Sequence, residues 1–358
     1  MNHSVINDSF GLPSINQTAS SHAEWSALPV IILITFFTGL IGNGALLIIF
    51  LTHRSLWTPF HVYVMNLLTA SCCCIATQFP LDVYVDLYGG QWLLGERTCS
   101  YYIIVSWYFQ AVIFNSHQLI AINRIWAVSH PISYRRIHSI PIAICLCVCV
   151  WLYVFAFLSP ALIRDSLYFR RPADGPDGCQ FNTPLQLGWA VAIQIVIYIC
   201  PQMTMVLALV IIILAKRTRR RRRRIRKRAN SVAPSTGNGA NHSQRPTVMK
   251  SVAGAEGSAV VQHQEAHPQR SHHLQQPRPI QQSHGDLLLI LLTISVLICW
   301  TPNNVYFSWL FFEPLDAPAF YATTTILVAF QATVDPIMLT FALGRLRTVL
   351  HQSFLCHR

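Results

Sequence analysis

Long apolar stretches alternate along the chain with short polar segments. Seven stretches contain no Lys, Arg, Asp or Glu, apart from Asp335 in the last: residues 27–53, 55–81, 98–123, 137–163, 178–215, 287–312 and 317–344. Each is long enough for a helix to cross a hydrocarbon core of about 30 Å, which takes about 20 residues. The apolar runs are continuous and do not alternate with a period of two, which excludes a transmembrane barrel. The pattern predicts an all-α membrane protein, a seven-transmembrane helix bundle over residues 27–344.

The prolines within these stretches do not argue against helices. In lipid, the backbone polar groups have to be paired inside each segment, so a proline there predicts a kink rather than a helix end. The prolines concerned are Pro80, Pro160, Pro201, Pro302 and Pro336.

Composition and charge add an orientation to this picture. Of the 358 residues, 53% are hydrophobic and 11% are charged, whereas a soluble domain contains about 25% charged residues. One side of the predicted bundle carries only Arg97, Arg164, Arg170 and Arg171, and the other side carries all remaining Lys and Arg. Because basic residues accumulate on the cytoplasmic side, the amino terminus is predicted outside a plasma-membrane protein and the carboxyl terminus inside.

The first 26 residues are predicted to form an extracellular, glycosylated tail. They contain three Asn-x-Ser/Thr acceptor sequences, at Asn2, Asn7 and Asn16. The tail lacks the basic start and the apolar run of a cleavable signal peptide, so the first span is expected to direct insertion.

Cysteine positions predict one disulfide. Eight of the eleven cysteines lie within spans, where a thiol usually packs as a small apolar group: Cys72, Cys73, Cys74, Cys145, Cys147, Cys149, Cys200 and Cys299. Only Cys99 and Cys179 lie on the predicted oxidising side, so we expect them to be bonded. Metal binding is the less favoured alternative, since no His or acid lies at ligand spacing around either cysteine.

Short motifs recur at defined places in the spans. They are Gly42 and Asn43 in the first, Asn66 and Leu67 in the second, Trp92 to Gly95 before Cys99, Asn123, Arg124 and Pro131 at the end of the third, Trp151 in the fourth, Pro201 in the fifth, Cys299, Trp300, Thr301 and Pro302 in the sixth, and Asp335 and Pro336 in the seventh. By their order and distribution, the chain resembles the rhodopsin-like (class A) G-protein-coupled receptors over residues 28–356, as a divergent member.

The resemblance implies roles for several of these residues. Arg124 would contact the G protein when the helices part, and a charge at the membrane edge is costly enough to be a functional candidate by itself. Trp300, Pro302, Asp335 and Pro336 would form the activation switch. The ligand pocket above Trp300 would be lined by Ser106, Gln110, Asn303, Asn304 and Phe307.

The chain departs from the family pattern at two places that affect activation. Asn123 stands where the family has an acid beside the arginine, and an amide cannot neutralise Arg124, so we expect elevated basal signalling. Leu209 and Leu339 replace two tyrosines that support the active arrangement, which would act in the opposite direction. The sequence leaves open which of these two opposite effects on activation is larger.

A third departure concerns the buried sodium site of the family. Ser71 stands in place of the usual acid of the second span, and the acid of the bundle is Asp335 in the seventh. Two interpretations of Asp335 stay open: sodium binding, and a protonated or water-bridged carboxyl group, which burial alone favours.

The resemblance also restricts the ligand. The lysines are Lys216, Lys227 and Lys250, none of them in a span, and Ala329 occupies the span-seven position of the opsin lysine, so a retinal Schiff base is excluded. Ser106 stands where amine receptors have an acid. We therefore expect a peptide or another polar ligand, with a neutral small molecule as the alternative.

The predicted outer surface is acidic, which would attract a cationic ligand. Four arginines there face ten acids: Asp8, Glu24, Asp82, Asp86, Glu96, Asp165, Asp174, Asp177, Glu313 and Asp316. Asp82 and Asp86 share a helix face just after Pro80, and the sequence leaves open whether they contact the ligand or are solvated rim charges.

The cytoplasmic side has three predicted features. The basic run 216–228 begins a long loop over 216–285; beside a span we expect it to bind anionic lipid rather than nucleic acid. The rest of that loop is rich in Ser, Gly, Gln, His and Pro and is predicted to be largely disordered. Residues 343–358 have the periodicity of a membrane-surface helix with a short tail, with Cys356 as a palmitoylation candidate.

Together these observations predict a plasma-membrane receptor that passes ligand binding to a heterotrimeric G protein. No nucleophile, base and orienting group come together, so we expect neither an enzyme nor a cofactor. The alternatives are a weakly coupling or constitutively active protein of this fold, and a transporter or channel, although we find none of the internal symmetry of transporters.

Overall fold

A computed structural model describes residues 23–173, 175, 178–232, 279–312, 317–344, 346, 348 and 349, without the side chains of 223 and 226–286. By its internal contacts the chain divides into two units, Met1–Ala215 with Ile280–Arg358, and Lys216–Pro279. All elements that concern the candidate site belong to the first unit.

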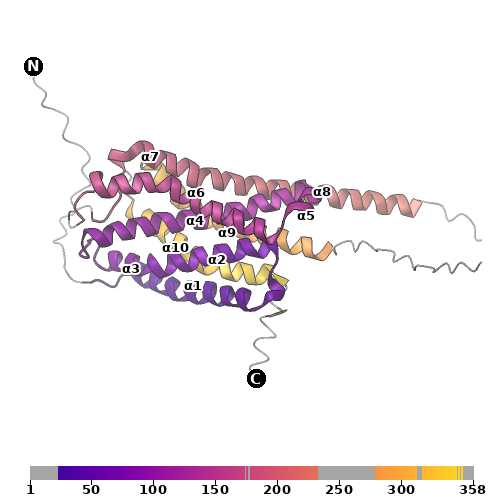
Figure 1. Ribbon diagram of the computed structural model, residues 1–358, viewed down its shortest axis with the longest axis horizontal. Coiled ribbons are helices and arrows are strands. Elements are labelled where there is room, and N and C mark those ends of the chain that lie inside the picture. Colours follow the sequence, from indigo (N-terminus) through magenta and orange to yellow (C-terminus); the bar gives the residue numbers. More distant parts are fainter. Residues whose placement is uncertain are drawn as a thin grey trace, which may run out of the picture. The chain divides into compact units, whose positions relative to one another are not determined.

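The predicted stretches are helical over most of their described residues, and the stretch 178–215 begins with a loop before Pro184 (Figure 1). The helices are α1 Ala27–Thr52, α2 Pro59–Thr77, α3 Phe79–Leu87, α4 Glu96–Ser129, α5 Pro131–Ile137, α6 Ile140–Arg164, α7 Leu187–Ile193, α8 Cys200–Val232, α9 Pro279–Trp309 and α10 Pro318–Ala342. Short helical turns cover Arg54–Leu56 and Pro184–Gln186, and π-helical segments cover Asp165–Phe169 and Gln194–Ile199. The all-α class is therefore confirmed for this part of the chain.

Six helical segments of the described chain are long and apolar enough to cross a membrane: Ala27–Thr52, Pro59–Leu87, Ile140–Phe169, Pro184–Arg222, Leu287–Trp309 and Pro318–Ala342. The third predicted span lies on α4, which has sufficient length with 34 residues. The polar run from Asn115 to Gln118 lowers the hydropathy of α4, because it places two amides, a hydroxyl and an imidazole inside the helix.

Local chemistry explains where the second span begins and bends. The hydroxyl of Thr58 accepts a hydrogen bond from the backbone N–H of His61, and Pro59 occupies the first helical position, where its missing N–H costs nothing. Gln78 separates α2 from α3, two residues before Pro80, whose ring interferes with the backbone of the preceding turn. At the predicted bend, the helix is thus interrupted at Gln78, and Asp82 and Asp86 lie on the new helix α3.

The fifth span contains a wider turn for a similar reason. The π-helical segment Gln194–Ile199 ends just before Pro201 in α8. Pro201 has no N–H to donate to the carbonyl of Ile197, so an α-helical register would leave that oxygen without its partner. In the wider turn, the carbonyl of Ile197 accepts a hydrogen bond from Nδ2 of Asn115 at 3.3 Å.

Small residues bring α1 close to α10. A Cβ atom at Gly42 would lie 3.0 Å from Cγ of Pro336, so only glycine fits without displacement. At the next residue of α1, Nδ2 of the fully buried Asn43 donates to the carbonyl of Ala332 at 2.8 Å. The motif residues Gly42 and Asn43 therefore fix the position of the seventh span beside the first.

Four consecutive residues of α4 bond to four different segments. Asn115 donates to the carbonyl of Ile197, Ser116 accepts from Asn66 on α2, His117 contacts Asp335 on α10, and Gln118 donates to Thr204 on α8. Successive helical residues are about 100° apart around the axis, so the four side chains leave α4 in all directions. Asn66 also accepts a hydrogen bond at 2.8 Å from the indole of Trp151 on α6.

The predicted disulfide is confirmed. Cys99 and Cys179 are bonded, with their Cα atoms 5.6 Å apart. In the same loop, the guanidinium of Arg170 contacts Oδ2 of Asp165 at 2.7 Å, and the Asp165 side chain is fully buried. The assignment of Asp165 to the acidic outer surface was wrong. Asp165 pairs with Arg170, five residues later, and both side chains are buried instead of facing water.

Several predictions lie outside the described residues. They concern Asn2, Asn7 and Asn16, the loop residues 233–278, and Cys356. Of the predicted membrane-surface helix 343–358, the structure describes too few residues to test it.

Candidate functional site

The arginine of the third span lies at the carboxyl-terminal end of α4. Arg124 is 9% exposed, and its guanidinium carbon lies 3.5 Å from the centre of the Phe60 ring on α2. A cation against an aromatic face is stabilised electrostatically, more strongly where water is excluded. The aromatic ring thus partly offsets the cost of holding this charge at the end of the bundle.

Asn123, beside the arginine, is bonded to the segment that follows α4. Its Oδ1 accepts from the Tyr134 hydroxyl at 3.2 Å, and its Nδ2 lies 3.0 Å from Nε2 of His138. The hydroxyl of Tyr63 on α2 also lies 3.0 Å from Nε2 of His138. Both ends of the Asn123 amide are therefore engaged by α5 and the residue after it.

The His138 imidazole is held as a neutral group. It stacks on the Tyr134 ring with the ring centres 4.3 Å apart. Burial, and then the positive charge of Arg124, lower the pKa of His138 from 6.5 to about 4. Burial raises the pKa of Tyr134, although Arg124 and Asn123 act in the opposite direction, so its hydroxyl remains a donor at neutral pH.

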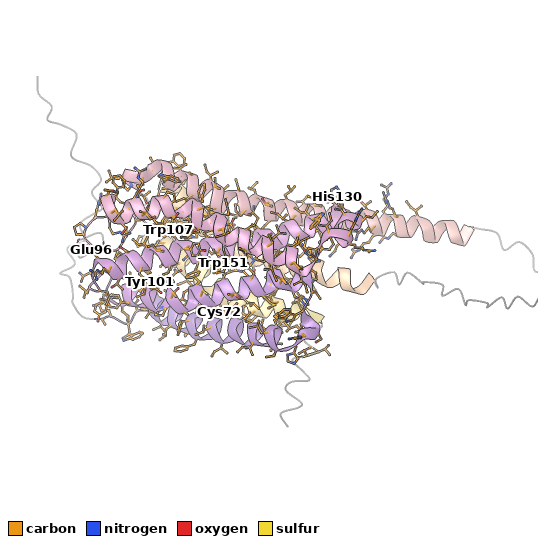
Figure 2. The ribbon with its side chains drawn as sticks, in the orientation of Figure 1. Cys72, Glu96, Tyr101, Trp107, His130 and Trp151 are labelled. Carbon is orange, nitrogen blue, oxygen red and sulfur yellow. A yellow bond between two sulfur atoms is a disulfide. The ribbon has the colours of Figure 1, made fainter. Side chains whose placement is uncertain are left out.

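A cavity of about 770 Å³ adjoins this cluster, lined by Ser129, Ile132, Arg136 and their neighbours in and before α5. Ile132 is 84% exposed, an unusual state for a large apolar side chain. Figure 2 shows His130, which ends α4 on this side, and Glu96 at the opposite end of the helix. Single exposed apolar side chains are common on protein surfaces, so Ile132 is of interest here because it lines the cavity.

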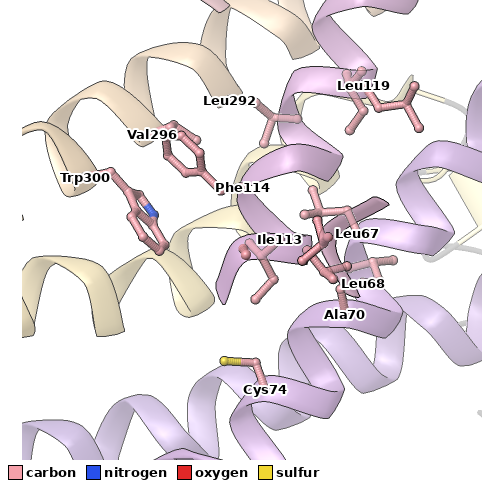
Figure 3. Packing of buried hydrophobic residues seen from close by; sticks show 14 of the residues in the cluster. Leu67, Leu68, Ala70, Cys74, Ile113, Phe114, Leu119, Leu292, Val296 and Trp300 are labelled. Atoms are coloured by element: carbon pink, nitrogen blue, oxygen red, sulfur yellow. The ribbon is translucent and has the colours of Figure 1, made fainter. Parts of the chain in front are cut away.

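The predicted switch tryptophan lies in the hydrophobic core. Figure 3 shows Trp300 beside Phe114 of α4 and Val296 of its own helix, and the centres of the Trp300 and Phe114 rings are 5.0 Å apart. The Tyr198 ring stacks on the Trp300 indole, with the ring centres 6.1 Å apart. Pro302, two residues later, lies within α9 without ending it. The switch position thus connects α9 to α4 through aromatic contacts.

Asp335 is fully enclosed and bonded on both oxygens. Oδ2 lies 3.1 Å from Nε2 of His117, and Oδ1 accepts from the amide of Gln331. The Gln331 amide also donates to Ser295 on α9 at 3.2 Å. Sequence reasoning identified Asp335 but not His117. The only sequence signal was a histidine in a span, since a buried histidine needs a partner.

A chain of hydrogen bonds links two of the predicted pocket residues through a third that was not predicted. The Gln110 amide donates to Oε1 of Gln78 at 3.1 Å, and the Gln78 amide donates to Oδ2 of Asp82 at 3.0 Å. Oδ1 of Asp82 accepts from the Tyr102 hydroxyl at 2.7 Å. Gln78, at the break between α2 and α3, therefore connects Asp82 with the deeper Gln110.

The other predicted pocket residues fall into three groups. Asn304 is buried and bonded to Gln202 and Gln194, so it connects α9 to the fifth span. The Ser106 hydroxyl is buried and has no hydrogen-bond partner within the described residues. Asn303 is half-buried, and Phe307 is 41% exposed.

Asp86 lies one turn beyond Asp82 on α3 and is half-buried. Aromatic rings surround this segment: Tyr84 packs against Tyr88 and Trp92, and Trp92 stacks on Tyr102 with the ring centres 5.2 Å apart. Two carboxyl groups beside aromatic faces form a chemical environment that suits a cationic group.

Comparison with known proteins identifies the family of this bundle. The chain matches the family described as 7 transmembrane receptor (rhodopsin family) over residues 42–339. It belongs to the rhodopsin family of seven-transmembrane receptors. The class predicted from the motifs is therefore confirmed, and Arg124, Trp300 and Asp335 all fall within the matched residues.

Individual members of the rhodopsin family are similar over a smaller part. A melanopsin of Homo sapiens is 30% identical over 137 residues, which cover 34% of this chain and 28% of that protein. Proteinase-activated receptor 2 of Mus musculus is 28% identical over 113 residues, which cover 30% of this chain and 27% of that protein. The matched part spans little more than a quarter of each of these receptors.

Proposed function

We propose that this rhodopsin-family receptor conveys the binding of an extracellular ligand to heterotrimeric G proteins at the plasma membrane. The observation that carries the proposal is Arg124, a nearly buried cation near the carboxyl-terminal end of α4, the helix that leads into α5 with its exposed Ile132 and a cavity. A buried charge beside an apolar docking feature suits a surface that is uncovered when the helices move. Membership of a receptor family favours a role without catalysis.

The proposed topology has seven crossings. α4 is the crossing added to the six apolar segments, and its polar residues are paired with neighbouring helices, which is how polar groups are accommodated in a bilayer. Basic residues place the amino terminus outside, where Asn2, Asn7 and Asn16 would be glycosylated. The basic run 216–228 would bind anionic inner-leaflet lipid, and Cys356 would carry a palmitoyl group.

For the ligand we propose a peptide or another polar molecule whose basic group reaches Asp82 and Asp86. Within the described residues, Asp82 has the neutral partners Tyr102 and Gln78. An incoming cation would thus gain a carboxylate without displacing another positive charge, and the neighbouring aromatic rings would add to its affinity. A neutral polar ligand in contact with Gln110 and Asn303 is the second candidate, favoured by the amides deeper in the bundle.

A screen in cells tests this function. Peptides and cationic and neutral small molecules are applied to cells that express the receptor and report several G-protein classes. We expect at least one ligand to stimulate nucleotide exchange, Arg124→Ala to abolish the response, and Asp82→Asn to weaken a cationic ligand at least tenfold.

Three outcomes would contradict parts of the proposal. Ligand binding without nucleotide exchange in any class would favour a weakly coupling protein, and ligand-dependent ion or solute flux would favour a channel or transporter. A response that Asp82→Asn leaves unchanged would move the ligand away from the acidic segment and support the neutral alternative.

A further inference from the structure

The contact between His117 and Asp335 joins two helices deep inside the bundle. Nε2 of His117 and Oδ2 of Asp335 are 3.1 Å apart, and the two side chains are 1% and 2% exposed. The residues lie 218 positions apart, on α4 and α10. Groups that can be charged are rare within membrane-spanning helices, and they are retained where they pair with one another or serve a function.

The protein already supplies donors to both oxygens of the carboxyl group. His117 contacts Oδ2, and the amide of Gln331, one turn before Asp335, donates to Oδ1. Ser295 of α9 holds the same amide at 3.2 Å. Asp335 is therefore held by His117 from α4 and by Gln331 from its own helix, and Ser295 of α9 fixes the Gln331 amide.

These residues do not fit a sodium ion. Hard cations such as sodium prefer several oxygen ligands, whereas Asp335 faces an imidazole nitrogen and an amide N–H. In addition, the second span contributes Ser71 and no second carboxylate. A cation at Oδ2 would have to displace His117 from a site that is closed to solvent.

Proton counting gives the charge of the pair. A carboxylate beside a neutral imidazole leaves one negative charge in the apolar interior, which is costly. One added proton makes the pair neutral overall, whether it lies on the imidazole or on the carboxyl group. The imidazole thus offers a site for the added proton beside the carboxylate. A lone aspartate would have to be compensated by a bound cation or by its own protonation.

We propose that His117 is a positioning residue that compensates Asp335 from within the protein in place of a sodium ion, and thereby fixes α10 against α4. It follows that the seventh span separates from the third by breaking a contact between two side chains rather than by releasing an ion. The consequence for signalling rests on the proposed function, whereas the pairing itself does not.

Thermal unfolding of the purified full-length receptor tests the pairing without any signalling assay. Wild type, His117→Gln, His117→Leu, Asp335→Asn and the His117→Leu/Asp335→Asn double variant are compared in sodium chloride and in N-methylglucamine chloride of equal ionic strength. For the wild type, we expect the same melting temperature in both salts. For His117→Gln, we expect sodium to raise the melting temperature by about 2 °C or more, because the carboxylate without its imidazole partner then gains from a cation.

The remaining variants separate a specific pair from general packing. We expect the double variant to melt higher than His117→Leu, since removing the acid relieves the uncompensated charge, and we expect neither variant that lacks the acid to respond to sodium. Should His117→Leu fail to fold, His117→Gln and its double variant with Asp335→Asn provide the same comparison.

Two results would overturn the proposal. One is sodium-specific stabilisation of the wild type as large as that of His117→Gln. The other is strict additivity of the two substitutions in the double variant. A receptor that shows the expected sodium pattern but activates no G protein would refute the proposed function and leave the pairing intact.

Discussion

The hydroxyl of Tyr134 on α5 donates a hydrogen bond of 3.2 Å to Oδ1 of Asn123 on α4. This contact attaches α5 to α4 at the residue before Arg124. It joins a hydroxyl to an amide and involves no carboxylate. His138 contributes a second attachment at the other end of the same amide. Both attachments of Asn123 are therefore neutral hydrogen bonds, which are each worth less than charge-assisted ones.

Asn123→Asp is expected to lower ligand-independent signalling. A carboxylate would keep the acceptor for Tyr134 and would add an attraction to the Arg124 charge. If the resting state gains about 1 kcal/mol, a small active population falls about fivefold. The measurement is second-messenger output without ligand at matched surface expression. Equal baselines for the two proteins would contradict the expectation.

Stability should fall as the medium is acidified, in a window set by His138. The pKa of His138 is lowered to about 4 from its ordinary value of 6.5, so the unfolded chain takes up the proton first. The stability contribution of the neutral imidazole is thus present above pH 6.5 and is lost as the pH falls from 6.5 to about 4. Melting temperatures of the purified receptor over this range provide the measurement.

The control for the acid effect is His138→Gln, which keeps hydrogen-bonding capacity and does not titrate. Its melting temperature should decline less than that of the wild type between the two pH values. Parallel curves for both proteins would assign the acid sensitivity to other groups.

Trp151→Phe is expected to destabilise the bundle by about 1–3 kcal/mol, because it leaves Oδ1 of the partly buried Asn66 without its indole donor. Asn66 also donates to Ser116, so three helices lose part of a shared contact. Trp189→Phe is the matched control, since that indole packs against Phe157 at the edge of the core. Equal melting temperatures for the two variants would show that the hydrogen bond contributes little.

Two glycines of the same helix are expected to differ when replaced by alanine. At Gly42 the added Cβ would lie 3.0 Å from the ring of Pro336, and at Gly44 it would meet no atom within 4 Å. Gly44→Ala should be neutral or slightly stabilising, as alanine is the better helix former. Gly42→Ala should be less stable than Gly44→Ala by about 1–2 kcal/mol, the usual cost of overpacking. Thermal unfolding of both variants decides this, and a reversed order would mean that α10 moves aside freely.

The spans and the disulfide were predictable because they depend on local composition. An apolar run must be helical in lipid whatever surrounds it, and two cysteines on the oxidising side leave one pairing. Partners across the bundle depend on how each helix is turned about its axis, which a span that is apolar all round does not specify. For this reason Asp335 was recognised while His117 was not, and Asp165 was mistaken for a surface charge.

Gln78 illustrates the same limit at a helix break. Pro80 predicted a bend, and the structure places the interruption of the helix two positions earlier, at Gln78. The bend turns the Gln78 side chain so that it contacts both Asp82 and Gln110. The sequence therefore identified Asp82 correctly as a candidate. Its connection to Gln110 could not be predicted, because it depends on the direction of the Gln78 side chain.

The ring of hydrogen bonds around α4 has a mechanical consequence. Because Asn115, Ser116, His117 and Gln118 each hold a different neighbour, a rotation of α4 about its own axis would stretch all four contacts together. A tilt of another helix that leaves α4 in place would break at most one or two of them. Within the described residues, α4 is thus held more firmly against rotation than against the displacement of a single neighbouring helix.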